Sequence, residues 1–158
     1  PPSFTASSNH SAIDFSDVGI DKARQIAERR GVEVNWIVGD VSTDELSAAE
    51  YDLVSVLYLH TGPEERLRWL PKVISAVGNS GTFIYIGHDP SNIEHGVGGP
   101  QKAELLPDSA AMCGALEGFR IDEAVIKERP VDADPGHGRE LAGIARDTFI
   151  RAVRTSRE

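Results

Sequence analysis

The sequence predicts an α/β domain with a mainly parallel sheet, helices on both faces and an antiparallel hairpin at the C-terminal end. As far as Gly87, apolar runs with the period of strands alternate with runs of helical period. This alternation is typical of strand–helix–strand units, whose strands are parallel. Two strand-like runs then lie close together near the C-terminus, as in a hairpin.

The first strand is expected at residues 12–15 and the first helix from Ser16 or Asp17 to Gly31. The Ser16 or Asp17 side chain can accept hydrogen bonds from free amides of the first helical turn. Gly31 tolerates the left-handed conformation that ends many helices. Residues 1–11 are polar and aperiodic, so we expect a loose tail followed by one domain at 12–158. One face of the helix carries apolar side chains at helical spacing: Val18, Ile20, Ala23, Ile26 and Ala27.

The middle of the chain predicts two further strands and a second helix. Residues 32–38 alternate as a strand does, and residues 41–50 form a polar loop or short helix. Residues 52–59 are nearly continuously apolar, as in a parallel strand covered on both faces. A helix opens near Thr61 with Pro63 in its first turn, and Pro71 should kink it. Its buried stripe is expected to be Leu67, Leu70, Val73, Ile74 and Val77.

The second half predicts a loop, a short helix and the closing hairpin. Residues 78–81 should form a turn into a strand at 82–86, and residues 88–104 a long surface loop rich in glycine. A helix is expected at 108–118 and strands at 119–131 and 148–153, with a turn at 134–138 between them.

Composition excludes several classes of function. The chain has 158 residues and a formal net charge of -9, which opposes binding to nucleic acid phosphates. No apolar run approaches the roughly 20 residues that span a bilayer, and no targeting signal is found, so we expect a cytoplasmic protein. Cys113 is alone and is expected to be a small buried apolar side chain. His88, Asp89 and His95 lack a recognised ligand spacing, so no metal is expected.

Several segments, in order, resemble class I S-adenosylmethionine-dependent methyltransferases, which have a Rossmann-like fold. Ala12-Ile-Asp-Phe-Ser-Asp resembles their second strand and the start of the helix that follows it. Gly39-Asp40 resembles the end of the third strand, Tyr51-Asp-Leu-Val-Ser-Val-Leu-Tyr-Leu-His60 the fourth strand, and Ser80-Gly-Thr-Phe-Ile-Tyr-Ile-Gly87 the fifth. The nearest branch is the small-molecule enzymes similar to tellurite-resistance and thiopurine methyltransferases. The match covers residues 12 to about 154.

The resemblance implies S-adenosylmethionine as the cofactor and assigns residues to its adenosine. Asp14 would accept hydrogen bonds from the ribose hydroxyls, and a helix-capping carboxylate is the alternative. Phe15 would pack on the adenine face or sit in the core. Asp40 would accept from the adenine amino group and the Val41 amide would donate to the ring, unless Asp40 is a plain turn residue.

The resemblance also assigns the end of the fourth strand. Leu57 and Tyr58 would border the methionine part of the cofactor, and His60, His88 and Asp89 would contact the substrate. His60 could act as general base, since its unperturbed pKa lies near 6.5. Methyl transfer to a thiolate depends mainly on alignment, so a base is not required in every such enzyme.

One family feature is not found before Asp14: the glycine-rich loop of the E/DxGxGxG kind, whose glycines let the backbone approach the cofactor closely. We therefore expect a sheet without its first central strand, which would leave two edges and a slot between residues 12–14 and 52–59. A break in the sequence just before Ala12 is the favoured explanation. A truncated product, residues left out of the chain, an unrelated tail in the slot and a strand from a partner chain are the alternatives.

The leading functional hypothesis is transfer of a methyl group from S-adenosylmethionine to a small-molecule acceptor. A non-catalytic methyltransferase-like domain that binds a protein partner is the alternative, which the missing loop supports. A nicotinamide-dependent dehydrogenase is a third, but it too requires a glycine-rich GxGxxG loop. Nucleic acid and membranes are not expected partners, and a homodimer is among the assemblies we consider.

Overall fold

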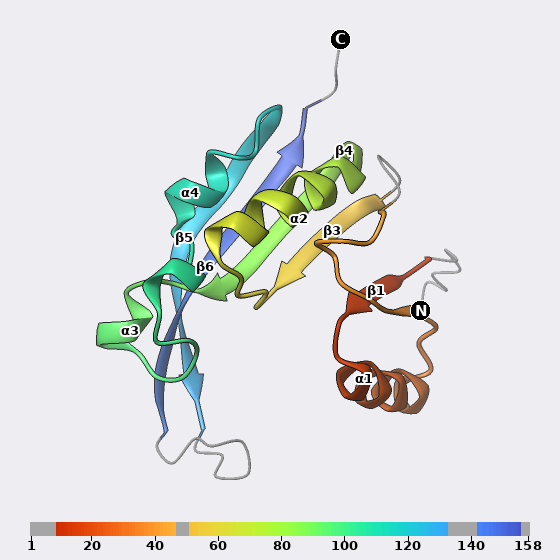
Figure 1. Cartoon of the computed structure of the whole chain (residues 1–158), viewed down its shortest axis with the longest axis horizontal. Helices are drawn as coiled ribbons and strands as arrows, with labels where there is room; N and C mark the ends of the chain where they lie inside the picture. Colours follow the sequence, from red (N-terminus) through yellow and green to blue (C-terminus); the bar gives the residue numbers. More distant parts are fainter. Residues whose placement is uncertain (1–8, 47–50, 133–141, 156–158) are drawn as a thin grey trace, which may run out of the picture. The chain divides into compact units, whose positions relative to one another are not determined.

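The computed structural model describes residues 9–46, 51–132 and 142–155. The chain divides into two compact units, Pro1–Glu45 and Leu46–Glu158, each with its own sheet (Figure 1). The predicted turn at 134–138 and most of the predicted tail lie outside the described residues.

The first unit contains one strand–helix–strand motif. Strand β1 (Ser11–Asp14) leads to helix α1 (Asp17–Arg30) and then to strand β2 (Asn35–Val38), which pairs with β1 in parallel. The Ser16 hydroxyl caps α1 by accepting from the Gly19 amide at 3.0 Å, and Gly31 ends the helix with a φ of 65°. Both end signals were predicted. Because Ser11 already belongs to β1, the strand begins one residue earlier than expected, and β2 begins at Asn35 rather than Val32.

The predicted apolar face of α1 is only partly buried. Ile20 is buried, whereas Val18 and Ile26 are 59% and 47% exposed. The helical period was therefore read correctly from the sequence, but it does not by itself fix how much of the face is covered.

The second unit has a four-stranded sheet in the order β3-β4-β6-β5. Strand β3 (Tyr51–Leu57) runs parallel to β4 (Val77–His88), and β4 pairs antiparallel with β6 (Gly143–Arg154). Strand β5 (Phe119–Val131) pairs antiparallel with β6 and completes the predicted hairpin. Within the described ranges β1 pairs with β2 alone and β3 with β4 alone, so each has an open edge.

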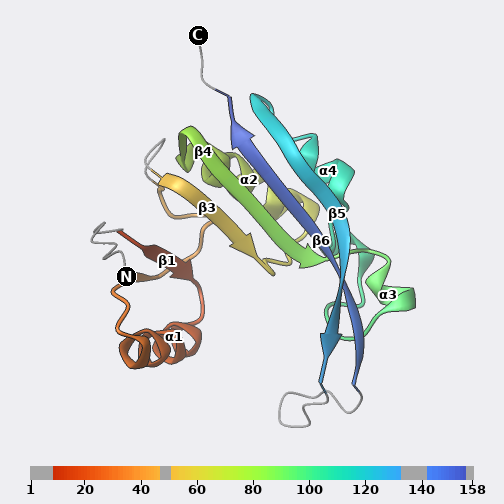
Figure 2. The same cartoon turned by 180° about the vertical axis from the view of Figure 1, so that it is seen from behind.

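Helices α2 (Pro63–Ala76) and α4 (Ser109–Cys113) lie on the same face of the four-stranded sheet, as the two opposite views show (Figures 1 and 2). The core forms where α2 meets this face, and its fully buried side chains include Trp69, Phe83, Tyr85, Ile150 and Ala152.

The predicted stripe of α2 needs a correction. Leu70 and Val73 are buried as expected, but Leu67 is 76% exposed and Val77 already begins β4. Trp69 takes the buried position instead, because the face that meets the sheet is centred near residues 69, 70, 73 and 76.

The predicted turn at 78–81 is also wrong, since these residues belong to β4. The register with β3 nevertheless shifts there: Tyr51 pairs with Val77, and the next pair is Leu53 with Thr82. A side chain at Gly81 would have its Cβ 2.9 Å from the carbonyl oxygens of Gly78 and Tyr51. The glycine therefore allows a close backbone approach inside a bulged strand.

The predicted surface loop at 88–104 contains helix α3 (Asn92–His95) and is anchored, and a short 3-10 turn η1 (Ala103–Leu105) follows it. The buried Asn92 side chain accepts from the Arg146 amide at 2.7 Å and donates to the Gly98 carbonyl at 2.9 Å. Helix α4 ends at Cys113, five residues before the predicted end, and Cys113 is half-buried. Among the described helices, none has the length and apolar character needed to cross a membrane.

Candidate functional site

In the first unit, two acidic residues follow the ends of neighbouring parallel strands. Asp14 ends β1 and pairs with Val38, the last residue of β2, and Asp40 follows two residues later. The Gly39 amide donates to the Asp14 carbonyl at 3.0 Å, which continues the ladder toward Asp40. Because paired strands lie about 4.8 Å apart, the two acids start from adjacent strand tips.

Both carboxylates organise the backbone that follows them. Asp14 Oδ1 accepts from the Ser16 amide and Asp40 Oδ1 accepts from the Ser42 amide, each at 2.8 Å. Asp14 does not cap α1, because Ser16 occupies that position. Each carboxylate thus has a backbone bond at one oxygen and remains exposed at the surface.

Phe15 and Val41 lie beside these acids. Phe15 is 76% exposed, so the core alternative for this side chain is wrong. Val41 is half-buried in the turn that the Asp40 carbonyl closes by accepting from the Thr43 and Asp44 amides at 3.0 and 2.8 Å. An exposed aromatic ring directly after a strand-end acid is a surface on which a planar ligand could stack.

In the second unit, a polar cluster lies at the carboxyl ends of β3 and β4. Its centre is Asp147 of β6, whose side chain is 5% exposed. Asp147 Oδ2 accepts from the Tyr58 hydroxyl and from Arg129 Nε, each at 2.8 Å. His88 Nδ1 lies 3.0 Å from Asp147 Oδ1.

The sheet register explains this convergence. His88 and Asp147 are directly opposite in the antiparallel β4–β6 pair, and Arg129 of β5 pairs with Ala145, one diagonal step from Asp147. Tyr58 follows β3 with a φ of 54°, and its amide donates to the Ile86 carbonyl at 2.7 Å. The four strands of this sheet therefore bring these side chains to one point.

The contact between His88 and Asp147 is short but poorly aligned. Although the two atoms are 3.0 Å apart, neither Nδ1 nor Oδ1 makes a hydrogen bond of acceptable angle, and both are buried. A carboxylate at this range attracts a ring N–H even when the bond is bent. Asp147 therefore favours a proton on the Nδ1 of His88.

His60 stacks on His88. The two ring centroids are 5.3 Å apart at an interplanar angle of 9°, and His60 Nε2 accepts from the His88 backbone amide at 3.3 Å. Burial lowers the pKa of His60, and the neighbouring His88 lowers it further, although Asp147 acts in the opposite direction. Burial also lowers the pKa of His88, against the raising effect of Asp147. Both rings are therefore neutral near neutral pH.

Tyr58 is held in its phenol form. Burial raises the pKa of Tyr58, and its hydrogen bond to Asp147 raises it further. The Arg129 guanidinium lies 5.6 Å from the Tyr58 ring centroid and acts in the opposite direction. Tyr58 thus serves as a hydrogen-bond donor to Asp147 and is 39% exposed, while Leu57 beside it is 57% exposed.

Asp89 is engaged within the chain. Its Oδ1 accepts from the Ser91 amide and hydroxyl at 2.9 and 2.6 Å, and its Oδ2 accepts from the Thr148 hydroxyl at 2.7 Å. Burial alone would raise the pKa of Asp89, but these hydrogen bonds outweigh burial and lower it. The geometry gives Asp89 a structural part at the start of α3.

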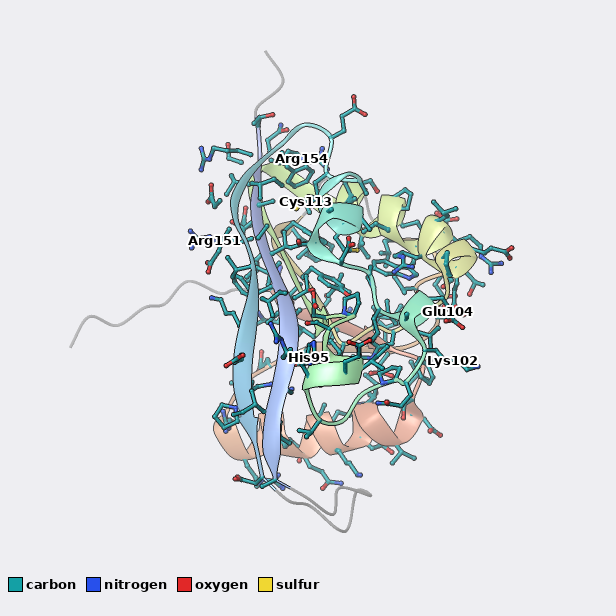
Figure 3. The ribbon with its side chains drawn as sticks, turned by 90° about the vertical axis from the view of Figure 1, so that its left-hand side faces the viewer. His95, Lys102, Glu104, Cys113, Arg151 and Arg154 are labelled. Carbon is teal, nitrogen blue, oxygen red and sulfur yellow. The ribbon has the colours of Figure 1, made fainter. Side chains whose placement is uncertain are left out.

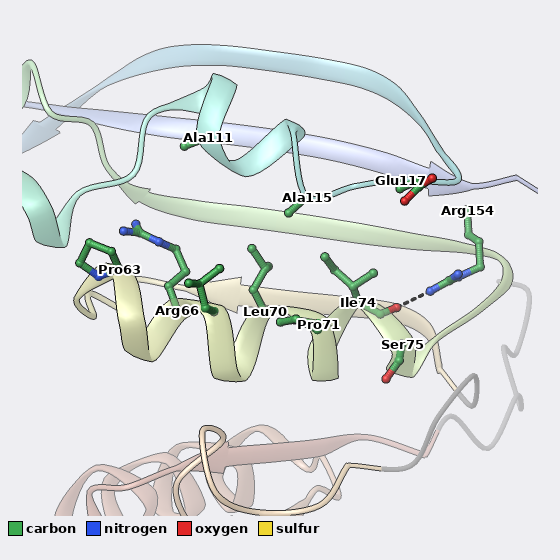
Figure 4. A pocket seen from close by; sticks show the side chains of 11 residues that line it. Pro63, Arg66, Leu70, Pro71, Ile74, Ser75, Ala111, Ala115, Glu117 and Arg154 are labelled. Carbon is green, nitrogen blue, oxygen red and sulfur yellow. Dashed lines mark hydrogen bonds between the residues drawn. The ribbon is translucent and has the colours of Figure 1, made fainter.

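Other candidate positions carry less chemistry. A hollow of about 520 Å³ between α2 and α4 is lined mainly by apolar side chains such as Leu70, Ile74 and Ala115 (Figure 4). His95 lies on α3, with its Nε2 3.7 Å from an exposed carboxylate of Glu94 (Figure 3). In the part of the chain that the structure describes, no group of three or more His, Cys, Asp or Glu is arranged to hold a metal ion.

Sequence reasoning brought Tyr58, His60 and His88 into one site, but it missed Asp147 and Arg129. Asp147 lies 89 residues from Tyr58 along the chain, so no local motif connects them. The available signal was an acid inside an apolar strand, Arg146-Asp-Thr-Phe-Ile150, since a strand seldom buries an acid without partners.

The comparisons agree on the fold. No family model matches the sequence, and no curated protein matches it either. Among solved structures, TehB from Haemophilus influenzae has a TM-score of 0.71 at 8% identity, with 94% of this chain and 51% of that chain covered. An S-adenosylmethionine-dependent methyltransferase from Methanosarcina mazei has a TM-score of 0.67 at 14% identity, with 93% and 82% covered.

The N-methyltransferase NodS from Bradyrhizobium japonicum has a TM-score of 0.66 at 14% identity, with 94% of this chain and 74% of that chain covered. The chain thus spans about half the length of TehB and about three quarters of NodS. Identities this low establish the arrangement of the backbone and not an activity. The Rossmann-like fold expected from the resemblance is therefore confirmed: the chain has the fold of these methyltransferases.

Proposed function

We propose that this chain transfers a methyl group from S-adenosylmethionine to a small-molecule acceptor. The observation that carries the proposal is the pair of exposed carboxylates, Asp14 and Asp40, at adjacent tips of parallel strands in a methyltransferase fold. In open α/β sheets, ligands bind beyond the carboxyl ends of the strands, where such groups can meet them.

The first unit supplies the groups for adenosine. Asp14 accepts hydrogen bonds from the ribose hydroxyls, using the oxygen that has no backbone bond and the remaining capacity of the other. Phe15 stacks on the adenine ring, Asp40 accepts from the adenine amino group, and the Val41 amide donates to a ring nitrogen. The exposure of Phe15 supports this assignment, because an unliganded stacking residue must be accessible.

The resemblance assigns residues at the ends of β3 and β4 to the reacting end. By the resemblance, Leu57 and Tyr58 contact the methionine part of the cofactor, and His60 and His88 contact the acceptor. The neutral imidazoles suit an uncharged acceptor, because neither ring adds a positive charge near neutral pH.

Isothermal titration calorimetry with S-adenosylhomocysteine tests the cofactor assignment. We expect saturable binding to the whole chain, weakened about tenfold or more by Asp14→Asn or Asp40→Asn, since a hydrogen bond to a charged group contributes about 1.5–3 kcal/mol. Asp21→Asn is the matched control, because Asp21 is an exposed acid on α1 whose partner is Arg24. No saturation at millimolar ligand, or equal affinities in all three variants, would overturn the proposal.

A second function is favoured by one observation. On the sheet face opposite α2, Leu53 and Leu57 of β3 are 55% and 57% exposed, and β3 has an open edge among the described residues. A non-catalytic, protein-binding domain would use such a surface. In that case the chain would elute as a complex with its partner, and S-adenosylhomocysteine would leave the elution unchanged.

A further inference from the structure

The two stacked histidines differ in which ring nitrogen carries the proton. His60 Nε2 accepts the backbone N–H of His88 at 3.3 Å, so its lone pair is already used. A neutral imidazole has one protonated nitrogen and one acceptor, and the proton of His60 must therefore lie on Nδ1. In this arrangement His60 can donate a hydrogen bond to a ligand but cannot take a proton from it.

His88 has the opposite arrangement. Its Nδ1 is buried against Asp147 Oδ1 at 3.0 Å, which places the ring proton on Nδ1 and leaves the lone pair on Nε2. Among the described residues no protein group bonds to Nε2, and this atom is not fully buried. A free lone pair on a carboxylate-oriented imidazole is the arrangement of a general base.

Asp147 is itself fixed. Tyr58 Oη and Arg129 Nε both donate to Oδ2 at 2.8 Å, so Oδ1 is the oxygen left to face His88. The carboxylate cannot rotate away without losing two hydrogen bonds at a buried position. Asp147 thus acts on His88 as a positioning residue.

A glycine lets the loop pack directly against the His88 ring. A Cβ on Gly99 would press on the ring nearest Cδ2, 2.7 Å from Nε2 and 2.8 Å from Cγ, and Gly99 has a φ of 74°. Any side chain at this position would push the ring away as well as strain the backbone. Gly99 therefore helps to hold His88 in its place against Asp147.

Four charged or titratable groups face His88, and they come from three strands or their ends. They are His60 after β3, Asp147 on β6, Arg129 on β5, and Tyr58 at the end of β3. Asp89 adjoins His88 in sequence, but both its oxygens are bound by Ser91 and Thr148. Among these groups Asp147 raises the pKa of His88, whereas Arg129 lowers it. Burial outweighs the effect of Asp147, so the pKa of His88 stays below its usual value.

We infer that His88, and not His60, accepts the proton in the proposed methyl transfer, and that the acceptor is therefore a hydroxyl or uncharged amine. This inference rests on the proposed function. As the acceptor oxygen or nitrogen bonds to the methyl carbon, the carbon–sulfur bond of the sulfonium breaks and its electron pair stays on sulfur. The acceptor proton moves to His88 Nε2, and the resulting imidazolium is stabilised by Asp147.

The tautomers can be measured without cofactor or substrate. Long-range proton–nitrogen NMR spectra of the ¹⁵N-histidine-labelled whole chain should show His88 protonated at Nδ1 with Nε2 free. Asp147→Asn should weaken this preference and lower the pKa of His88, because Asp147 raises it. Asp122→Asn, an exposed acid on β5 bonded to Arg120, is the control and should change neither. A His88 ring protonated at Nε2 would overturn the assignment.

Measurements of kcat on two acceptors test whether His88 acts as a base or only packs in the site. With catechol as hydroxyl probe, whose hydroxyl is not ionised near neutral pH, His88→Gln should lower kcat about 100-fold or more, and His60→Gln far less. With thiophenol, an already ionised acceptor, His88→Gln should change kcat less than about threefold, since alignment dominates. The acid limb of the kcat profile should follow the His88 pKa measured by NMR and move to lower pH in Asp147→Asn.

A failure of the His88 assignment can be distinguished from a failure of the proposed function. Equal losses on both probes, or methylation of thiophenol alone by the wild type, would overturn the role of His88 while leaving methyl transfer intact. Absence of S-adenosylhomocysteine binding in the wild type would instead remove the proposed function, whatever tautomer the NMR spectra show.

Discussion

Thr61→Val is a test of the contact that fixes the end of β3 onto α2. The Trp69 indole is fully buried, and its Nε1 donates to the Thr61 hydroxyl at 2.8 Å. Valine has nearly the shape of threonine but no acceptor, so the indole N–H would be left without a partner. An orphaned buried donor costs about 1–3 kcal/mol, so we expect the free energy of unfolding to fall by about 2 kcal/mol. For a chain of this size that is about 4–8 °C in Tm.

Urea unfolding followed by tryptophan fluorescence measures this loss. The sequence has two tryptophans, Trp36 and Trp69, and a Trp36→Phe background leaves Trp69 as the reporter in the second unit. Thr61→Ser keeps the acceptor and removes one methyl group, which should cost about 1 kcal/mol or less. In a Trp69→Phe background, followed by circular dichroism, Thr61→Val should cost little because no donor remains to be orphaned.

The reasoning would be refuted by a Thr61→Val variant within about 0.5 kcal/mol of the wild type at an unchanged m-value. The reasoning would also be refuted if Thr61→Val lowered the free energy of unfolding equally with Trp69 present and in the Trp69→Phe background. In either case the hydrogen bond would not be what fixes this segment, and the placement of Tyr58 and His60 would need another cause.

Two further predictions concern stability. Because His60 and His88 have lowered pKa values in the folded chain, the unfolded chain binds more protons below about pH 6.5. The free energy of unfolding should therefore be constant above pH 7 and fall as the pH drops through 6; a flat urea midpoint from pH 7.5 to 5 would contradict these shifts. Gly87→Ala would push a methyl group against the buried Tyr85 ring and should lower stability by about 1–3 kcal/mol, measured by urea unfolding beside Gly62→Ala, where the added Cβ meets open space.

The order of the elements was predictable because each carries a local signal. Alternating apolar residues, the Ser16 cap and Gly31 identified the first strand–helix–strand motif, and the two long β-rich runs identified the hairpin. Boundaries were harder, since strands here continue past their apolar residues. The β4 strand starts at Val77 directly after α2, and only the register shift near Gly81 marks the place where the sequence predicts a turn.

The polar cluster was predictable only in part. Tyr58, His60 and His88 follow strand ends, where a parallel sheet collects functional groups, and reasoning from strand order brings them together. Asp147 lies within β6 and Arg129 near the end of β5, and their positions depend on which residues pair in these antiparallel strands. No pattern within either strand predicts its register. Asp147, the residue that makes His88 and not His60 the candidate base, therefore could not be identified from the sequence.

The register that builds the core also builds this cluster. Along β6, Thr148, Ile150 and Ala152 are fully buried on the face that meets α2, whereas Asp147 and Arg151 point to the other face. A slip of one residue would turn Asp147 toward the core and expose Ile150. The apolar residues therefore set the position of the buried acid opposite His88, and the acid in turn decides which imidazole nitrogen is free. Hydrophobic packing thus determines which nitrogen of His88 is free at the end of β4, although the apolar side chains contribute no reactive atom to the site.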